Sequence, residues 1–276
     1  MTARATVCLT FDFDAISIWI GPMGATSPSM ISRGEFGVVG VERILRLLDR
    51  ERIPATFFVP GHTADTYPDS VRAIVRAGHE VGHHGYLHEN PVALESAERE
   101  REVLERGLDA LDRAAGVRPR GYRSPAWDNS PHTIELLVEH GFRYESSLMG
   151  KDFEPYWCRV GDVIRKDGPY EFGREVDLVE LPVSWVLDDF PHFEFEVGWS
   201  TDQAAPSRVY EIWHGEFEYA HAHAPGGFLG ICMHPQVIGR GHRMLMLERL
   251  IAHFRRHEDV RFATLSTAAE DFRAKR

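Results

Sequence analysis

The sequence predicts an α/β fold in which about seven strands, each followed by a helix or a loop, curl into a closed or nearly closed β/α barrel. Two observations support this prediction. Short apolar segments without a helical period alternate along the chain with longer segments whose apolar residues recur at helical spacing. Acidic, basic and histidine residues follow several of the short segments, as they do at the carboxyl ends of parallel strands in enzymes. An open, doubly wound sheet is the alternative architecture.

The first half of the chain carries the clearest alternation of elements. Residues 13–36 are irregular and hold several Gly and Pro, which predicts a long loop that forms a lid or a pocket wall. Gly78, Gly116 and Gly141 are expected to end the helices that precede them. The predicted helices cover residues 38–52, 68–77, 91–115 and 131–140. The predicted strands cover residues 5–11, 54–59, 79–82, 120–123 and 142–145.

The second half departs from this rhythm before it returns to it. Between residues 151 and 181 we expect strand-like pieces around Val163 and over residues 176–181, separated by glycine turns. Residues 182–200 are rich in aromatic and acidic residues and are expected to form a second wall loop. Helices are then predicted over residues 207–222, 243–257 and 266–275, the last capped by Ser266, and strands over residues 228–233 and 260–265.

Composition limits the partners and the location. The net charge of −11 argues against a nucleic-acid or anionic-membrane partner. No apolar run approaches the ~20 residues that span a bilayer, and the first residues lack the regions of a signal peptide. Cys8, Cys158 and Cys232 are widely separated and are expected to be reduced, buried thiols. Together these features predict a cytoplasmic location.

Two stretches carry residues that suit a metal site. Asp12 and Asp14 lie two residues apart at the end of a predicted strand, so their side chains should share a face. His84 and His88 lie four residues apart after another predicted strand. Two imidazoles and one carboxylate can hold a divalent cation and leave room for water, and the second carboxylate is then free to act as a base. The alternative is a histidine pair on a helix face and a capping aspartate.

Four segments, taken in order, resemble the motifs of the polysaccharide deacetylase family, the NodB-homology hydrolases of carbohydrate esterase family four. Residues 10–14 (TFDFD) resemble the first motif, with one residue inserted between the acids, and residues 84–88 (HGYLH) resemble the paired-histidine motif. Residues 123–127 (RSPAW) resemble the Arg-x-Pro motif, and residues 231–235 (ICMHP) resemble the final histidine motif. The resemblance implies one catalytic domain over residues 1–276, a distorted barrel of seven strands and a divalent metal, usually zinc.

Two further segments narrow the resemblance to a subgroup. The inserted residue, residues 32–37 (SRGEFG) and residues 234–240 (HPQVIGR) resemble intracellular members of the family. That subgroup includes cyclic-imide hydrolases, metal-free allantoinases and some proteins called peptidoglycan deacetylases. Family membership therefore leaves the substrate open between an N-acetylated sugar and a small cyclic imide or ureide.

The resemblance also gives roles to the strand-end residues. Asp14, His84 and His88 are the expected ligands of Zn²⁺, with Co²⁺ as an alternative. Asp12 is the expected base that takes a proton from the attacking water, and His234 is the expected acid for the leaving nitrogen. Their structural alternatives are a carboxylate bonded to backbone donors and a strand-end histidine bonded to a carbonyl.

The remaining candidates each have two interpretations. Arg123 is expected either to orient Asp12 through a paired hydrogen bond or to form a structural ion pair. Aromatic side chains either line a substrate pocket or serve packing, and Tyr86 either holds the substrate or is spaced by chance. The tryptophans in question are Trp19, Trp127 and Trp185.

Other histidines are expected to lie outside the site. His83 should point away from the site, whereas the histidines of the predicted helix 207–222 are solvated or lie at a contact between copies of a homo-oligomer. These histidines are His214, His221 and His223.

Three classes of function follow from these residues. The first is a metal-dependent hydrolase of a non-peptide carbon–nitrogen bond, which acts on an N-acetylated sugar or peptidoglycan fragment, or alternatively on a cyclic imide or ureide. The second is a non-catalytic barrel that binds a ligand, in which Asp12→Asn would change nothing except stability. The third, nucleic-acid binding, is disfavoured by the charge and by the lack of a basic stripe.

Overall fold

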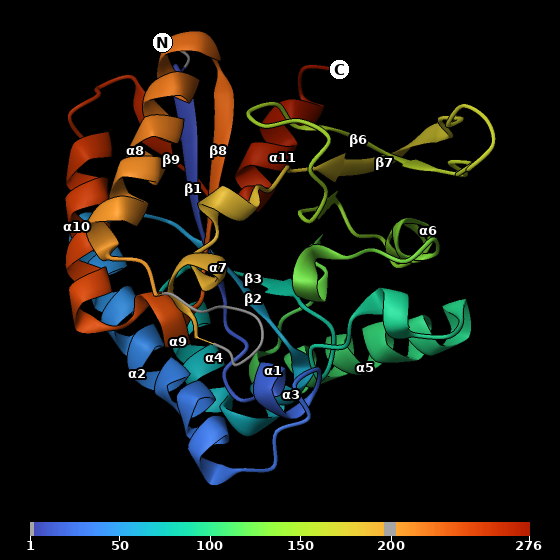
Figure 1. Cartoon of the computed structure of the whole chain (residues 1–276), viewed down its shortest axis with the longest axis horizontal. Helices are drawn as coiled ribbons and strands as arrows, with labels where there is room; N and C mark the ends of the chain where they lie inside the picture. The colour runs from blue at the N-terminus through green and yellow to red at the C-terminus, as the bar shows by residue number, and fades with distance from the viewer. Residues whose placement is uncertain (1–2, 196–202) are drawn as a thin grey trace.

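The fold is organised around one sheet whose strands are mostly parallel (Figure 1). The structure is a computed structural model that describes residues 3–195 and 203–276. The described strands follow the order β6-β7-β5-β4-β3-β2-β1-β8, and β9 pairs with the first residues of β1. The antiparallel pair is β6 with β7. The strands are β1 (Ala5–Asp12), β2 (Thr56–Val59), β3 (Glu80–His83), β4 (Gly121–Tyr122), β5 (Tyr144–Glu145), β6 (Tyr156–Val160), β7 (Arg174–Glu180), β8 (Gly227–Met233) and β9 (Val260–Phe262).

The sheet curls until its two ends approach each other. After β7 the chain runs to Asp188, which forms a single parallel bridge with Cys232 of β8. This bridge lies on the seam between β7 and β8, which are not paired as strands within the described residues. The predicted, nearly closed β/α barrel is therefore confirmed, and the open doubly wound sheet is excluded.

Helices follow most of the parallel strands, as expected for crossover connections. Figure 1 shows α2, α8 and α10 together along one side of β1 and β8. The helices are α1 (Ser17–Ile20), α2 (Pro28–Glu51), α3 (Gly61–Thr66), α4 (Pro68–Arg76), α5 (Ala97–Ala115), α6 (Thr133–Glu139), α7 (Phe190–Phe193), α8 (Pro206–His223), α9 (Pro235–Ile238), α10 (Gly241–Phe254) and α11 (Leu265–Arg273). The described residues also form the short 3₁₀ helices η1 (Pro91–Ala93), η2 (Pro125–Trp127) and η3 (Trp185–Leu187). Among the described residues, no helix combines the length and apolarity that a membrane crossing needs.

Strand β1 is buried along its whole length because both of its faces are covered. Leu9 and Phe11 face the helices and join the larger apolar core. Cys8 faces the barrel interior, where it packs with Phe58 and Tyr144. Burial of apolar surface on both faces fixes the register of β1, and so fixes where its carboxyl end presents Asp12.

The predicted loop over residues 13–36 is wrong in its second half, because α2 begins at Pro28. A proline suits the first helical position, where its missing N–H costs nothing. Gly34, one of the glycines that suggested a loop, makes a close contact in α2, and so does Gly40 in the predicted helix 38–52. A Cβ on Gly34 would lie 2.3 Å from the carbonyl oxygen of Ala15, and a Cβ on Gly40 would lie 2.0 Å from that of Pro235. These glycines let α2 pack directly against the loop that follows β1 and against the start of α9, which follows β8.

Other element boundaries also need correction. The predicted helix 91–115 starts at Ala97, because the Ser96 side chain caps it by accepting the N–H of Arg99, and η1 precedes it. The last helix is capped by Thr264, not by Ser266. The strand-like piece around Val163 is a single bridge, and the strand in this region is β6. The predicted wall loop 182–200 contains η3 and α7, and its residues 196–200 lie outside the described residues.

Candidate active site and metal centre

Side chains that follow the carboxyl ends of four parallel strands meet at one edge of the sheet. All of them are at least nine-tenths buried. This convergence is what the strand-end positions predicted. The residues are Asp12 at the end of β1, His84 after β3, Arg123 after β4 and His234 after β8, with Asp14 and His88 in the loops that continue from β1 and β3.

Asp14, His84 and His88 form a cluster that fits a divalent cation. Oδ1 of Asp14 lies 3.4 Å from Nε2 of His84 and 3.8 Å from Nε2 of His88. This oxygen is buried and has no hydrogen-bond partner, which is costly for a carboxylate unless a cation or proton satisfies it. Two imidazole nitrogens and one carboxylate oxygen are the ligand types of a catalytic zinc site with open positions.

A tight turn, and not a helix, brings the two imidazoles together. Gly85 and His88 both have positive φ angles, of 70° and 57°. The carboxylate of Glu89 accepts the backbone N–H groups of Tyr86 and Leu87, which holds the turn in place. The imidazole rings of His84 and His88 are consequently 4.9 Å apart. The alternative of a histidine pair on a helix face is therefore wrong.

The protonation states of the two histidines suit metal binding. Nδ1 of His84 lies 2.7 Å from the carbonyl oxygen of Arg123, so Nδ1 carries the proton and Nε2 is free toward Asp14. Burial lowers the pKa of His84 to about 4, and it lowers the pKa of His88 well below its ordinary value. Burial likewise raises the pKa of Asp14 to about 8. Both imidazoles are thus neutral, which is the form that coordinates a metal.

Asp12 is held as a carboxylate by Arg123. Nη1 of Arg123 lies 2.8 Å from Oδ1 of Asp12, and both side chains are buried. Burial raises the pKa of Asp12, but Arg123 and the neighbouring histidines outweigh it, so the pKa lies below its usual value. The other oxygen of Asp12 lies 3.4 Å from Sγ of Cys232. Arg123 therefore makes a single hydrogen bond to Asp12, and not the expected pair of hydrogen bonds.

His234 has a carboxylate partner that the sequence analysis missed. Nδ1 of His234 lies 2.7 Å from Oδ1 of Asp189, and its backbone N–H donates to both oxygens of the same carboxylate. Oδ1 of Asp188 lies 3.5 Å from the same Nδ1. Burial lowers the pKa of His234, but Asp188 and Asp189 raise it more, so the pKa lies well above its usual value. His234 is therefore an imidazolium near neutral pH.

A second missed residue lies beside the metal cluster. Nε2 of Gln236, in α9, lies 3.4 Å from Oδ2 of Asp14. The same carboxylate oxygen is 3.7 Å from Nε2 of His234. Asp14 thus uses one oxygen toward α9 and His234, and leaves the other for the two imidazoles. The sequence offered no signal for Gln236 except its place two residues after His234.

Comparisons with known proteins agree with this geometry. The family model of the polysaccharide deacetylases matches residues 2–145. A peptidoglycan deacetylase from Helicobacter pylori is 39% identical, over 99% of this chain and 97% of its own length. The chain belongs to the polysaccharide deacetylase family. It is a hydrolase that acts on carbon–nitrogen bonds other than peptide bonds.

Solved structures extend the comparison to the whole fold. The crystal structure of a protein from Mycobacterium smegmatis, described as a polysaccharide deacetylase, is 40% identical and superposes with a TM-score of 0.88 over 100% of this chain and 92% of its own. An allantoinase is 26% identical, with a TM-score of 0.79 over 99% of this chain and 91% of its own. The fold is thus shared with one protein described as a polysaccharide deacetylase and with another described as an allantoinase.

Four of the candidate site residues of this polysaccharide deacetylase family member, Asp12, His84, His88 and His234, line a small cavity of about 280 Å³. Apolar residues form most of its wall, and they come from α1, the loop after it, η2, η3 and α7. Asn90 and Asp188 add polar groups beside those already described. The full lining is Asp12, Ile18, Pro22, Met23, His84, His88, Asn90, Ala126, Trp127, Trp185, Asp188, Phe190 and His234.

Two of the predicted aromatic residues line this cavity and two do not. The indoles of Trp127 and Trp185 stack with ring centroids 4.4 Å apart. Trp19 is fully buried away from the cavity, with the Arg33 guanidinium 4.1 Å above its ring. The hydroxyl of Tyr86 donates to Asp65, and the Arg106 guanidinium lies over its ring, so this buried side chain points away from the cavity. Trp19 and Tyr86, which were expected to contact the substrate, are thus not part of the lining of this cavity.

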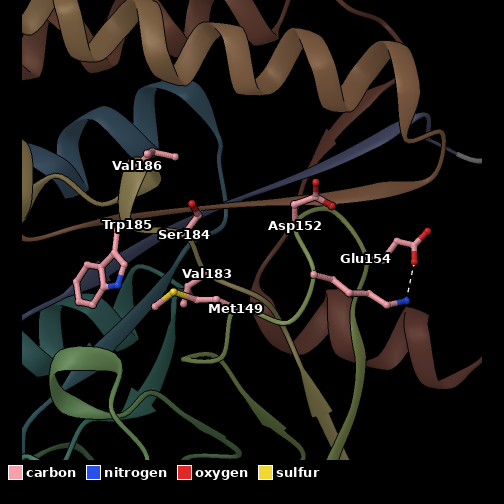
Figure 2. A pocket seen from close by; sticks show the side chains of 8 residues that line it. Met149, Asp152, Glu154, Val183, Ser184, Trp185 and Val186 are labelled. Atoms are coloured by element: carbon pink, nitrogen blue, oxygen red, sulfur yellow. Dashed lines mark hydrogen bonds and ion pairs between the residues drawn. The ribbon is translucent and has the colours of Figure 1, made fainter. Parts of the chain in front are cut away.

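Trp185 also borders a second, more open groove of about 740 Å³ (Figure 2). Figure 2 shows its indole on one side and Glu154, which pairs with Lys151, on the other, with Met149 and Val183 between them. Asp152, Ser184 and Val186 complete the lining of this groove. Trp185 therefore forms a wall that the small cavity and the open groove share.

One expectation concerned a histidine outside the site. His83 points away from the cavity, as predicted, and its Nε2 lies 3.0 Å from the carbonyl oxygen of Leu104 in α5. Burial lowers the pKa of His83 to about 3, so it is a neutral core side chain. Its ring stacks on Tyr122 at 5.5 Å. His83 therefore positions the end of β3 by packing.

Proposed function

We propose that this chain removes the acetyl group from the nitrogen of an N-acetylated amino sugar, in a peptidoglycan or related glycan fragment. One observation carries the proposal. Two groups with opposite proton-transfer roles, an ionised Asp12 and a protonated His234, flank the cluster of Asp14, His84 and His88 at one cavity. Amide hydrolysis needs such a pair, because water must lose a proton and the leaving nitrogen must gain one.

The metal in this proposal is Zn²⁺, held by Asp14, His84 and His88, with Co²⁺ as a substitute. The two-nitrogen, one-oxygen donor set and the unpartnered Oδ1 of Asp14 support it. When bound, such a cation would polarise the amide carbonyl and lower the pKa of a water molecule toward 7.

The protein residues then divide the proton transfers. Asp12 accepts a proton from the attacking water, and Arg123 keeps that carboxylate oriented through its hydrogen bond. His234 donates its Nε2 proton to the departing nitrogen, while Asp189 holds the ring through Nδ1. Trp127 and Trp185 exclude water from one side of the cavity and offer flat surfaces on which a sugar ring can stack.

Release of acetate from N-acetylglucosamine oligomers tests this proposal. We expect turnover with Zn²⁺ or Co²⁺ supplied, and a loss of about 10²- to 10⁴-fold in kcat for Asp12→Asn and for His234→Gln. Gln236→Ala is a milder control, because Gln236 bonds to Asp14 but transfers no proton in this scheme. The absence of acetate with either metal, from protein shown to be folded, would refute the sugar as substrate.

A second candidate substrate is a small cyclic imide or ureide. The enclosed cavity of about 280 Å³ and its apolar wall favour a compact, flat molecule. The 26% identity with an allantoinase over 99% of the chain points the same way. Ring opening of succinimide or hydantoin, assayed beside the sugar oligomers, decides between the two. If only the imide is turned over, Asp12 and His234 would have the same proton-transfer roles in a ring-opening reaction.

Membership of a hydrolase family disfavours the second class of function, a non-catalytic barrel that binds a ligand. That class predicts that Asp12→Asn changes no rate, so the assays above also test it.

We further infer that residues 1–276 act as one catalytic domain, and that the protein works in the cytoplasm. The three cysteines Cys8, Cys158 and Cys232 support that location, since all are buried free thiols.

A further inference from the structure

A cluster of imidazole and carboxylate groups lies on the helical layer of the barrel, apart from the catalytic cavity. It is formed by His214 and Glu218 of α8 and His253 of α10, with His257 after the end of α10. Neither helix contributes a residue to the cavity lining. Figure 1 shows α8 and α10 side by side on the outside of the sheet.

Glu218 is the centre of this cluster. Its Oε1 lies 2.6 Å from Nε2 of His253, 3.7 Å from Nε2 of His214 and 3.8 Å from Nε2 of His257. The ligand atoms of His214, Glu218 and His253 all lie within 4.8 Å of one another. Donors bound to one tetrahedral zinc ion are about 3.3 Å apart, so rotations of these side chains alone would reach that geometry.

We propose that His214, Glu218 and His253 bind a second divalent cation of the zinc class, which links α8 to α10. Two imidazoles and one carboxylate suit Zn²⁺, Co²⁺, Ni²⁺ or Cu²⁺ and leave a position for water or His257. The site is independent of the proposed hydrolase activity, since it shares no residue with the catalytic cavity.

The helices hold these ligands ready. His214 and Glu218 are four residues apart on α8, so they project from the same side of the helix. The ring of His253 packs 4.2 Å from that of His214 and 5.6 Å from the fully buried ring of Phe217. Phe217 thus forms an apolar floor beneath the site, which reduces the side-chain entropy that binding would cost.

The hydrogen bonds of His253 are compatible with this role. Arg256 contacts Nδ1 of His253, and Nε2 therefore carries the proton that faces Glu218. Coordination at Nε2 requires that the proton move to Nδ1 and that Arg256, which is exposed, turn toward solvent. The ring stays neutral in both arrangements, so binding needs no change in its net protonation.

Metal content of the full-length protein tests the proposal. After the chain is loaded with Zn²⁺ and desalted, we expect two zinc ions per chain by mass spectrometry. His214→Ala and Glu218→Gln should each reduce this to one without changing kcat, and both side chains are at least one-third exposed, so folding should tolerate the changes. Asp14→Ala should remove the other ion. His223→Ala, on the exposed last turn of α8, is the matched control and should keep two.

Three results would overturn the proposal. One is a single zinc ion in the wild-type chain that Asp14→Ala abolishes. Another is two ions retained in both His214→Ala and Glu218→Gln. The third is loss of the second ion in His221→Ala alone, because His221 pairs with Asp259 in a neighbouring group. Failure of the sugar and imide assays would leave this measurement unaffected, since it reads metal content and not turnover.

Discussion

Nδ1 of His234 lies 2.7 Å from Oδ1 of Asp189, although 45 residues separate them in the chain. This contact fixes the ring so that Nε2 faces Asp14 and the cavity. It also adds negative charge beside the ring, which favours the imidazolium. The proposed general acid therefore depends on a residue that touches neither the cation cluster nor the cavity.

Asp189→Asn should weaken catalysis through His234. The amide keeps the shape but loses the charge, so the pKa of His234 should fall. We expect kcat to drop about 10- to 100-fold, as is usual for a residue that orients a catalytic group. The alkaline limb of the kcat profile should also move to lower pH, which pH–rate measurements detect. A uniform loss of activity with an unmoved limb would show that Asp189 is only structural.

Breaking the buried Asp12–Arg123 pair should destabilise the fold. Arg123→Met leaves the carboxylate of Asp12 buried without its cation, and we expect a loss of about 3–5 kcal/mol in the free energy of unfolding. The double variant Asp12→Asn with Arg123→Met removes both charges and should be more stable than Arg123→Met alone. Urea unfolding measures both variants. A double variant that is the less stable of the two would contradict the charge argument.

Asp14 should make the stability of cation-free protein depend on pH. Burial raises its pKa in the folded chain to about 8, whereas the unfolded chain ionises near pH 4. The stability that Asp14 contributes is therefore complete below about pH 4 and is lost as the pH rises toward 8. With EDTA present at pH 8, we expect Asp14→Asn to exceed the wild type by on the order of 2 kcal/mol.

Urea unfolding at pH 5 and pH 8 checks this dependence. The advantage of Asp14→Asn should shrink at pH 5, where the wild-type carboxyl is protonated in the folded chain. Asp69→Asn is the matched control, because the Asp69 side chain is 95% exposed, and it should show no such difference. An equal advantage at both pH values would exclude a titrating Asp14 as the cause.

Trp185 should affect substrate binding more than stability. Its side chain is 46% exposed, yet it lines the catalytic cavity and stacks on Trp127. We expect Trp185→Ala to raise KM several-fold and to change the melting temperature little, because little apolar surface loses its cover. Phe172→Ala, an exposed aromatic outside the cavity lining, should leave KM unchanged. A KM equal to wild type would remove Trp185 from the substrate wall.

The sequence allowed the barrel to be predicted because its signals are local. The strands are short apolar runs, and Gly116 ends α5 in the left-handed conformation that glycine favours. The start of α2 was missed because Pro28 and Gly34 resemble loop signals, and Gly40 lies within the helix that was predicted. The actual role of the two glycines, close packing against segments that follow β1 and β8, is a tertiary contact that no local pattern reveals.

The site was predictable only in part for the same reason. Asp12 and His84 follow strands and lie in recognisable motifs, so their meeting at one edge follows from parallel topology. Asp189 could not be separated from Asp188 by sequence, because only the seam between β7 and β8 decides which carboxylate reaches His234. Trp19 and Trp127 are both buried, and only the tertiary structure shows that Trp127 lines the cavity and Trp19 does not.

The single bridge between Asp188 and Cys232 has a consequence for how the enzyme fails. The neighbouring residue, Asp189, holds His234 in place, so the backbone contact that closes the barrel also positions the proposed proton donor. Local opening of this bridge on heating would abolish turnover while the other strands remain paired and the helices remain folded. Gentle heating should thus yield an inert but still largely native population, and cooling should restore it.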